Sequence, residues 1–145
     1  MKLPEYISKA EVKRVCKELG IRDWSTLMEI NVTTKEAALI LEAVNVKKMP
    51  ISVEVFKQGL EVELEHGFRF EDANVTNNHP ILTGKIVLAH LKETMDYYYR
   101  LEVAEIEGDL LKAVLVKNLQ KIEDKYKKLI KAESLLNKAV AAQIK

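Results

Sequence analysis

The chain has 145 residues, of which 48% are apolar and 31% charged, and it carries a formal charge of +1. This balance is typical of one globular domain, or of one domain with an appended helix, and it excludes a disordered chain. The near-neutral charge argues against a nucleic-acid-binding protein, since such proteins usually have a strong basic excess.

Only three Pro and five Gly interrupt the chain, too few for many strands and turns. We therefore expect an all-α fold, a compact helical bundle with a long C-terminal helix. Ser8-x-x-Glu11 and Thr33-x-x-Glu36 have the capping-box spacing of helix starts. Gly20 and Asn45 offer left-handed stops to the two helices that follow. Because both segments carry the same order of signals, residues 8–21 and 33–46 suggest a duplicated helix–loop unit.

Cys16 is the single cysteine, which excludes an internal disulfide and a zinc site built from several thiolates. It falls in register with Val12, Val15 and Leu19, which predicts a small core hydrophobe rather than a reactive thiol. The N-terminus lacks the apolar run of a secretory signal, and no stretch is long enough to span a bilayer. We therefore expect a cytoplasmic protein without a membrane partner.

A third helix is predicted from Ser52 to His66, with Gly67 as its stop. The irregular stretch that follows, residues 67–80, contains several Asn and is expected to be ordered by Asn side chains that bond its own backbone. It should lie close to Glu63. A fourth helix is predicted from Thr83 to Glu107, with a break at Gly108.

These elements predict a helical domain over residues 5–107 and a long, coiled-coil-like C-terminal helix over residues 109–145. The last helix carries an apolar row at alternating three- and four-residue steps: Leu115, Leu119, Ile122, Tyr126, Leu129, Leu136 and Val140. An isolated monomer would expose this row. We therefore expect either a homodimer or protein partner that binds through residues 111–140, or docking of the helix on its own domain.

Two helices place ionisable residues on their packing faces. On a helical wheel Glu63 falls in the middle of the apolar face of the third helix, and His66 follows on the same face. His90 falls among apolar residues of the fourth helix, with Glu93 at the edge of that face. A buried, unpaired carboxylate costs several kcal/mol, so Glu63 needs a partner, and His90 is the predicted one.

Two arrangements would satisfy these residues. In one, Glu63, His66, His90 and Glu93 form a structural network. In the other they bind a divalent metal ion, because Glu-x-x-His is the spacing with which helix bundles aim two ligands at one ion. A di-iron site would need further inward-facing glutamates, and none of Glu11, Glu18, Glu36 and Glu42 is clearly inward-facing. The structural network is therefore the preferred interpretation.

The chain also resembles a small family of uncharacterised bacterial and phage proteins. The resemblance rests on four stretches: Val62–Gly67 (VELEHG), Asn74–Asn77 (NVTN), Thr83–Glu93 (TGKIVLAHLKE) and Asp96–Tyr98 (DYY). It implies that Glu63, His66, His90 and Glu93 belong to the family's signature. The family has no established activity, so the resemblance implies no function.

The sequence thus predicts a non-catalytic structural or interaction protein with a buried Glu/His network. The alternative is a metal-binding protein or metalloenzyme that uses Glu63, His66, His90 and Glu93, and a nucleic-acid-binding helical module is a weaker third. No catalytic residue and no organic cofactor is predicted, because phosphate-loop, zinc-protease and nucleophile-elbow motifs are absent from the sequence.

Overall fold

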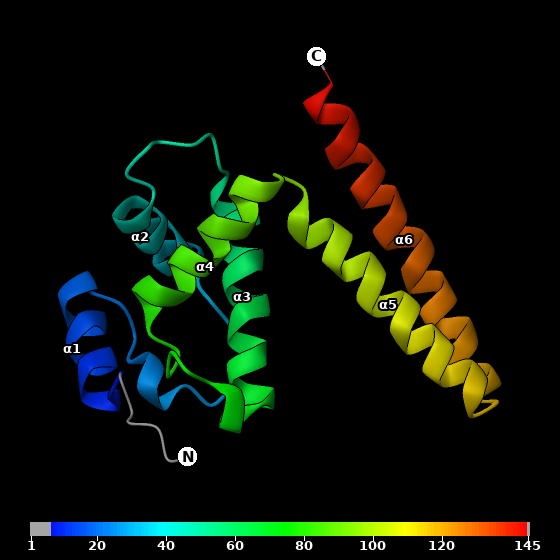
Figure 1. The fold of residues 1–145 in the computed structure, drawn as a ribbon, viewed down its shortest axis with the longest axis horizontal. Coiled ribbons are helices and arrows are strands. Elements are labelled where there is room, and N and C mark those ends of the chain that lie inside the picture. The colour runs from blue at the N-terminus through cyan, green and yellow to red at the C-terminus, as the bar shows by residue number, and fades with distance from the viewer. Residues whose placement is uncertain (1–6, 145) are drawn as a thin grey trace. The chain divides into compact units, whose positions relative to one another are not determined.

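A computed structural model describes residues 7–144, and these form six α-helices, two short 3-10 helices and no strand (Figure 1). The all-α prediction is confirmed. The described residues form two compact units, 7–92 and 93–144. None of their helices combines the length and apolarity needed to cross a bilayer.

The first unit contains α1 (Lys9–Leu19), η1 (Trp24–Thr26), α2 (Thr34–Val44), α3 (Val53–Arg69), η2 (Glu71–Ala73) and nearly all of α4 (Pro80–Glu93). Side-chain caps start three of its helices, because the hydroxyls of Ser8, Thr33 and Ser52 each accept a hydrogen bond from a backbone N–H in the first turn. The reciprocal bond of a capping box is present at Thr33 and Glu36. At the start of α1, the Glu11 carboxylate pairs with Arg14 at 2.7 Å.

The core of this unit comes from all four of its α-helices and from η1. Its fully buried side chains, with at most 1% exposure, are Val12, Cys16, Trp24, Val32, Ala37, Ile40, Phe56, Leu60, Leu64, Val87 and Leu91. The predicted core role of Cys16 is confirmed, and burial raises the pKa of its thiol. Gly84 lets α4 approach α2 closely, since a Cβ there would lie 2.6 Å from Ile40 Cγ2.

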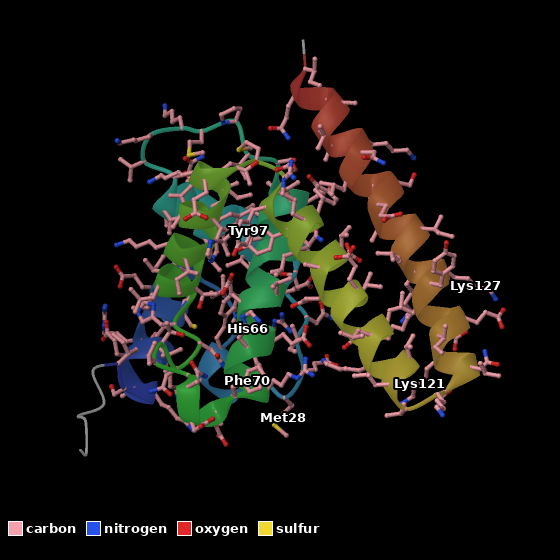
Figure 2. All side chains as sticks on the ribbon, turned by 45° about the vertical axis from the view of Figure 1, so that its right-hand side comes forward. Met28, His66, Phe70, Tyr97, Lys121 and Lys127 are labelled. Carbon is pink, nitrogen blue, oxygen red and sulfur yellow. The ribbon has the colours of Figure 1, made fainter. Side chains whose placement is uncertain are left out.

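The second unit is an antiparallel hairpin of α5 (Tyr97–Leu115) and α6 (Leu119–Gln143), which lie side by side in Figures 1 and 2. The turn is a Schellman motif, in which Lys117 N–H bonds Val114 O and Asn118 N–H bonds Ala113 O. Lys117 takes the left-handed position (φ 54°), and the Asn118 side chain caps α6. An ion pair of 2.6 Å between Lys125 Nζ and Asp109 Oδ2 joins the two helices.

Several predicted helix ends are wrong. Asn45 is not left-handed (φ −86°), and its side chain instead bonds both backbone groups of Met49. α3 continues through Gly67 to Arg69, and α5 continues through Gly108 to Leu115. The long C-terminal helix exists but begins at Leu119, not at 109. The domain of residues 5–107 and the duplication of 8–21 and 33–46 stay predictions.

Candidate functional site

Glu63 lies on α3 with its side chain 13% exposed, and two imidazoles flank its carboxylate. Oε1 is 3.6 Å from Nε2 of His90 on α4, and Oε2 is 3.8 Å from Nδ1 of His66 one turn further along α3. Both separations exceed the usual hydrogen-bond range, so they are electrostatic contacts that strengthen when an imidazole is protonated. The prediction that Glu63 and His90 lie close enough to interact is confirmed.

The two histidines are less buried than the sequence suggested. The side chain of His90 is 28% exposed and that of His66 is 49% exposed. His66 lies in the last turn of α3 and Phe70 directly follows the helix, with ring centroids 6.5 Å apart (Figure 2). Glu93, the last residue of α4, is exposed. The distances from the Glu63 carboxylate bring together Glu63, His66 and His90.

A pocket of about 210 Å³ lies beside the Glu63 carboxylate. It is lined by Glu63, His66, Gly67, Phe70, Ala73, Asn74, Val75, Thr76 and Ile86. Most of this wall is apolar, and the only ionisable groups in it are Glu63 and His66. In residues 7–144, no group of three or more His, Cys, Asp and Glu side chains is arranged to hold a metal ion. The assignment of Glu63, His66, His90 and Glu93 as metal ligands stays a prediction.

The Asn-rich connection forms the outer wall of this pocket. Asn74 Nδ2 donates to Gly67 O at 3.2 Å and to Asn78 Oδ1 at 3.0 Å, and the Asn77 side chain donates to Ile7 O. Asn77 and Asn78 adopt left-handed backbone angles (φ 48° and 59°), which Asn tolerates better than most residues. The Asn74 bond to Gly67 O is of the predicted kind, an Asn side chain bonding the backbone of its own connection, whereas Asn77 bonds the backbone of Ile7 outside it. The predicted proximity to Glu63 is confirmed, because Asn74 and Glu63 line the same pocket.

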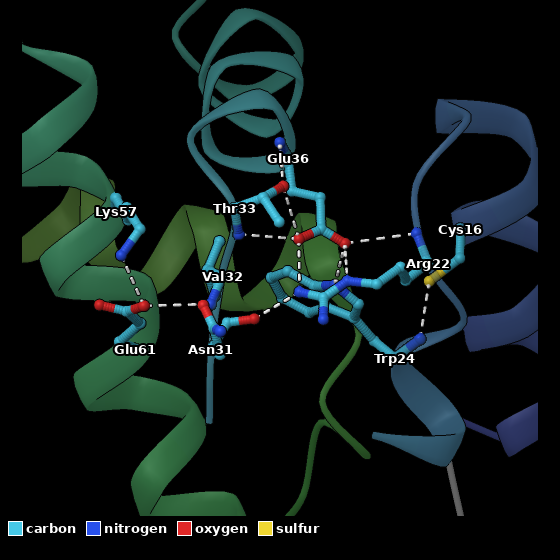
Figure 3. A network of polar contacts seen from close by, with 9 residues as sticks. All are labelled: Cys16, Arg22, Trp24, Asn31, Val32, Thr33, Glu36, Lys57 and Glu61. Atoms are coloured by element: carbon cyan, nitrogen blue, oxygen red, sulfur yellow. Dashed lines mark hydrogen bonds and ion pairs between the residues drawn. The ribbon is translucent and has the colours of Figure 1, made fainter. Parts of the chain in front are cut away.

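A second buried carboxylate, which the sequence analysis did not identify as inward-facing, is Glu36 on α2 (Figure 3). Only 4% of this residue is exposed. Its Oε1 accepts from Arg22 Nε at 2.9 Å and from Trp24 Nε1 at 3.3 Å. Its Oε2 accepts from Arg22 Nη2 at 2.7 Å and from the N–H and hydroxyl of Thr33, both at 2.9 Å.

These bonds determine the ionisation of Glu36. Burial alone would raise its pKa, but the donors from Arg22, Thr33 and Trp24 outweigh burial and lower the pKa to about 2. The Glu36 carboxylate is therefore charged, and its hydrogen bonds hold residues 22–33 against α2. This is a structural role.

In the second unit, the carboxylate of Asp96 is buried, with only 2% of the residue exposed. Arg100 binds it with two hydrogen bonds, of 2.9 and 2.8 Å, and the Thr94 hydroxyl also donates to it. Arg100 is the main cause that lowers the pKa of Asp96 to about 2. This pair fixes the first turn of α5.

The model of one protein family, described as a protein of unknown function (DUF5661), matches residues 12–107. The matched range contains Glu36, Glu63, His66 and His90 and ends before α6. No curated protein and no solved structure matches the chain. The expected likeness to an uncharacterised family is confirmed at the level of the family, and the signature motif itself stays a prediction.

Proposed function

The chain belongs to DUF5661, a family of proteins of unknown function, and we propose that it is a non-catalytic interaction protein that pairs with a second copy of itself through residues 111–140. One observation carries this proposal. Eight large apolar side chains in that range are at least 38% exposed: Leu111, Val114, Leu115, Val116, Leu119, Tyr126, Ile130 and Leu135. So many exposed large apolar side chains within one short hairpin favour a protein interface.

The Glu/His contact serves the fold of the first unit in this proposal. Glu63 is held between α3 and α4, and each of its oxygens faces an imidazole. A carboxylate in this setting stabilises the packing of two helices, since losing either partner leaves the other poorly compensated. Glu36 has a structural role of the same kind, because hydrogen bonds from Arg22, Trp24 and Thr33 join it to the segment that precedes α2.

Light scattering coupled to gel filtration tests the proposal. We expect the full chain to have the mass of a dimer, and the double substitution Leu111→Gln and Leu115→Gln to give a monomer with unchanged helix content. The matched control is Met28→Gln with Val46→Gln, which removes two apolar side chains that are even more exposed (93% and 83%) from the first unit and should leave the dimer intact. A wild-type chain that stays monomeric at its highest soluble concentration would disprove self-association.

A further inference from the structure

One face of α5 combines two small residues with two large ones. Ala104, Gly108, Leu111 and Leu115 follow each other at steps of four, three and four residues, which places them on one side of the helix. Ala104 is exposed, Leu111 is 59% exposed and Leu115 is 72% exposed. A Cβ added at Gly108 would meet no atom within 4 Å.

This face points away from α6. Asp109 lies about 160° around the helix from Leu111, and it makes the ion pair with Lys125 of α6. Ala113, about 200° from Leu111, is 4% exposed. Within the hairpin, therefore, α6 covers one side of α5 and leaves the side with Leu111 and Leu115 uncovered.

The uncovered face is complementary to itself in an antiparallel arrangement. Residues 104 and 115, like residues 108 and 111, are equally far from a point between Asp109 and Leu110. A two-fold axis through that point would set Leu115 of each copy against Ala104 of the other, and Leu111 against Gly108. Small residues opposite large ones allow two helices to approach closely. A parallel arrangement would instead stack large on large and leave the small positions empty.

Charge favours the same direction. Residues 97–109 contain four carboxylates and one arginine, whereas residues 110–131 contain seven lysines and two carboxylates. An antiparallel pair sets the basic end of one hairpin beside the acidic end of the other, and a parallel pair sets like charges together. Glu105 and Lys112 lie on the same flank of α5. In the antiparallel pair, Glu105 of each copy would therefore lie near Lys112 of the other copy.

We infer that two copies of the chain pair antiparallel through α5, with Leu111 and Leu115 of each packed on Gly108 and Ala104 of the other. This inference rests on the proposed self-association, and it adds which face of α5 forms the interface and that the two helices run antiparallel. The occupant of the face is a second copy, because the α5 face supplies both the large and the small surface and both signs of charge.

Disulfide trapping between variants that each carry one added cysteine tests the direction. Ala104→Cys and Leu115→Cys are prepared separately, carry tags of different mass, and are oxidised alone and as a mixture. Antiparallel pairing should give a crosslinked heterodimer in the mixture and little crosslinking of either variant alone. The unsubstituted chain is the control, since its single Cys16 is buried. Crosslinking of each variant alone would show a parallel pair and overturn the inference.

Gly108→Leu tests the face without relying on disulfide geometry. Leucine is a better helix former than glycine, and its Cβ would meet no atom of the chain within 4 Å, so the monomer should be at least as stable. In the antiparallel pair it would collide with Leu111 of the other copy, and we expect the dimer dissociation constant to rise about tenfold or more.

Ser134→Leu, at an exposed position of α6, is the matched control and should leave the dissociation constant unchanged. A dimer that tolerates Gly108→Leu and gives no mixed crosslink would overturn this inference and leave the proposed self-association standing. A chain that is monomeric in every sample would overturn both.

Discussion

Glu36 and Glu63 are the two largely buried carboxylates of residues 7–92, and Glu36 has the stronger set of partners. Its pKa is about 2 in the folded chain against an ordinary value of 4.5. A lowered folded pKa contributes stability that is present above pH 4.5 and is lost as the pH falls towards 2. We expect Glu36→Gln to reduce the free energy of unfolding by roughly 3 kcal/mol at pH 7.

The same substitution should also flatten the pH dependence of stability between pH 4.5 and 2. Urea unfolding at a series of pH values measures both effects. Glu42→Gln is the control, because Glu42 lies on the same helix and is exposed. Equal losses for the two substitutions would show that the bonds to Arg22, Thr33 and Trp24 contribute little.

The contact between Glu63 and His90 predicts energetic coupling. Glu63→Gln keeps the shape and removes the charge, and His90→Ala removes the imidazole. We expect their effects on the free energy of unfolding to be non-additive by about 1 kcal/mol. The same cycle with His66→Ala should give a smaller coupling, because His66 is more exposed and its contact is longer. Strictly additive effects would contradict a network, whereas coupling that appears only with added zinc would support the metal-ligand prediction instead.

The sequence predicted that Glu63 and His90 lie on packing faces, but it did not predict that Glu36 is buried. The two cases differ in which part of the chain supplies the partners. Glu63 stands in the middle of a long, regular apolar face, so helical periodicity alone marks it as anomalous. Glu36 lies in the first turn of α2, and Arg22 and Trp24 reach it from an irregular connection that periodicity does not describe. Two signals in the sequence could have indicated the buried Glu36. One is the capping box of Thr33 and Glu36, and the other is Trp24, whose indole N–H needs an acceptor when it lies in a core.

At the scale of the elements, the sequence predicted the starts of α1, α2 and α3 and the end of α1 at Gly20. It did not predict the other helix ends, the break that separates α4 from α5, or the start of α6 at Leu119. The starts depend on local chemistry, a hydroxyl three residues before a free N–H, which the sequence displays directly. Glycine was read as a stop at positions 67 and 108, yet a helix tolerates glycine at a cost of about 1 kcal/mol. The break between α4 and α5 contains no Gly or Pro, and it is stabilised by the pairing of Asp96 with Arg100.

Gly67, inside α3, leaves space for side chains of the Asn-rich connection. A Cβ there would lie 2.3 Å from Asn78 Oδ1 and 2.8 Å from Asn74 Nδ2. Although alanine is the better helix former, we expect Gly67→Ala to lower the free energy of unfolding by about 1–2 kcal/mol, through loss of the Asn74 bonds. Gly108→Ala meets no atom and should raise it by about 0.5–1 kcal/mol, as helix propensity alone predicts. Urea unfolding of both variants measures these changes. A Gly67→Ala variant that is more stable than the unsubstituted chain would contradict the role given to the Asn side chains.

At the scale of the whole molecule, the two units bury very different cores. Fifteen buried apolar residues belong to residues 7–92 and four to residues 93–144, so the hairpin has far less stabilising burial of its own. Pairing with a second copy would stabilise the hairpin by mass action and leave the first unit unaffected. We therefore expect two thermal transitions. The circular dichroism signal of the helices should include one transition whose midpoint temperature rises with protein concentration. Trp24 is the single tryptophan and is 1% exposed, so its fluorescence reports on the first unit. The midpoint temperature of the fluorescence change should not depend on protein concentration. If the two signals have the same midpoint temperature, the hairpin unfolds together with the rest of the chain. If that temperature also does not change with protein concentration, no second copy contributes to the stability of the hairpin.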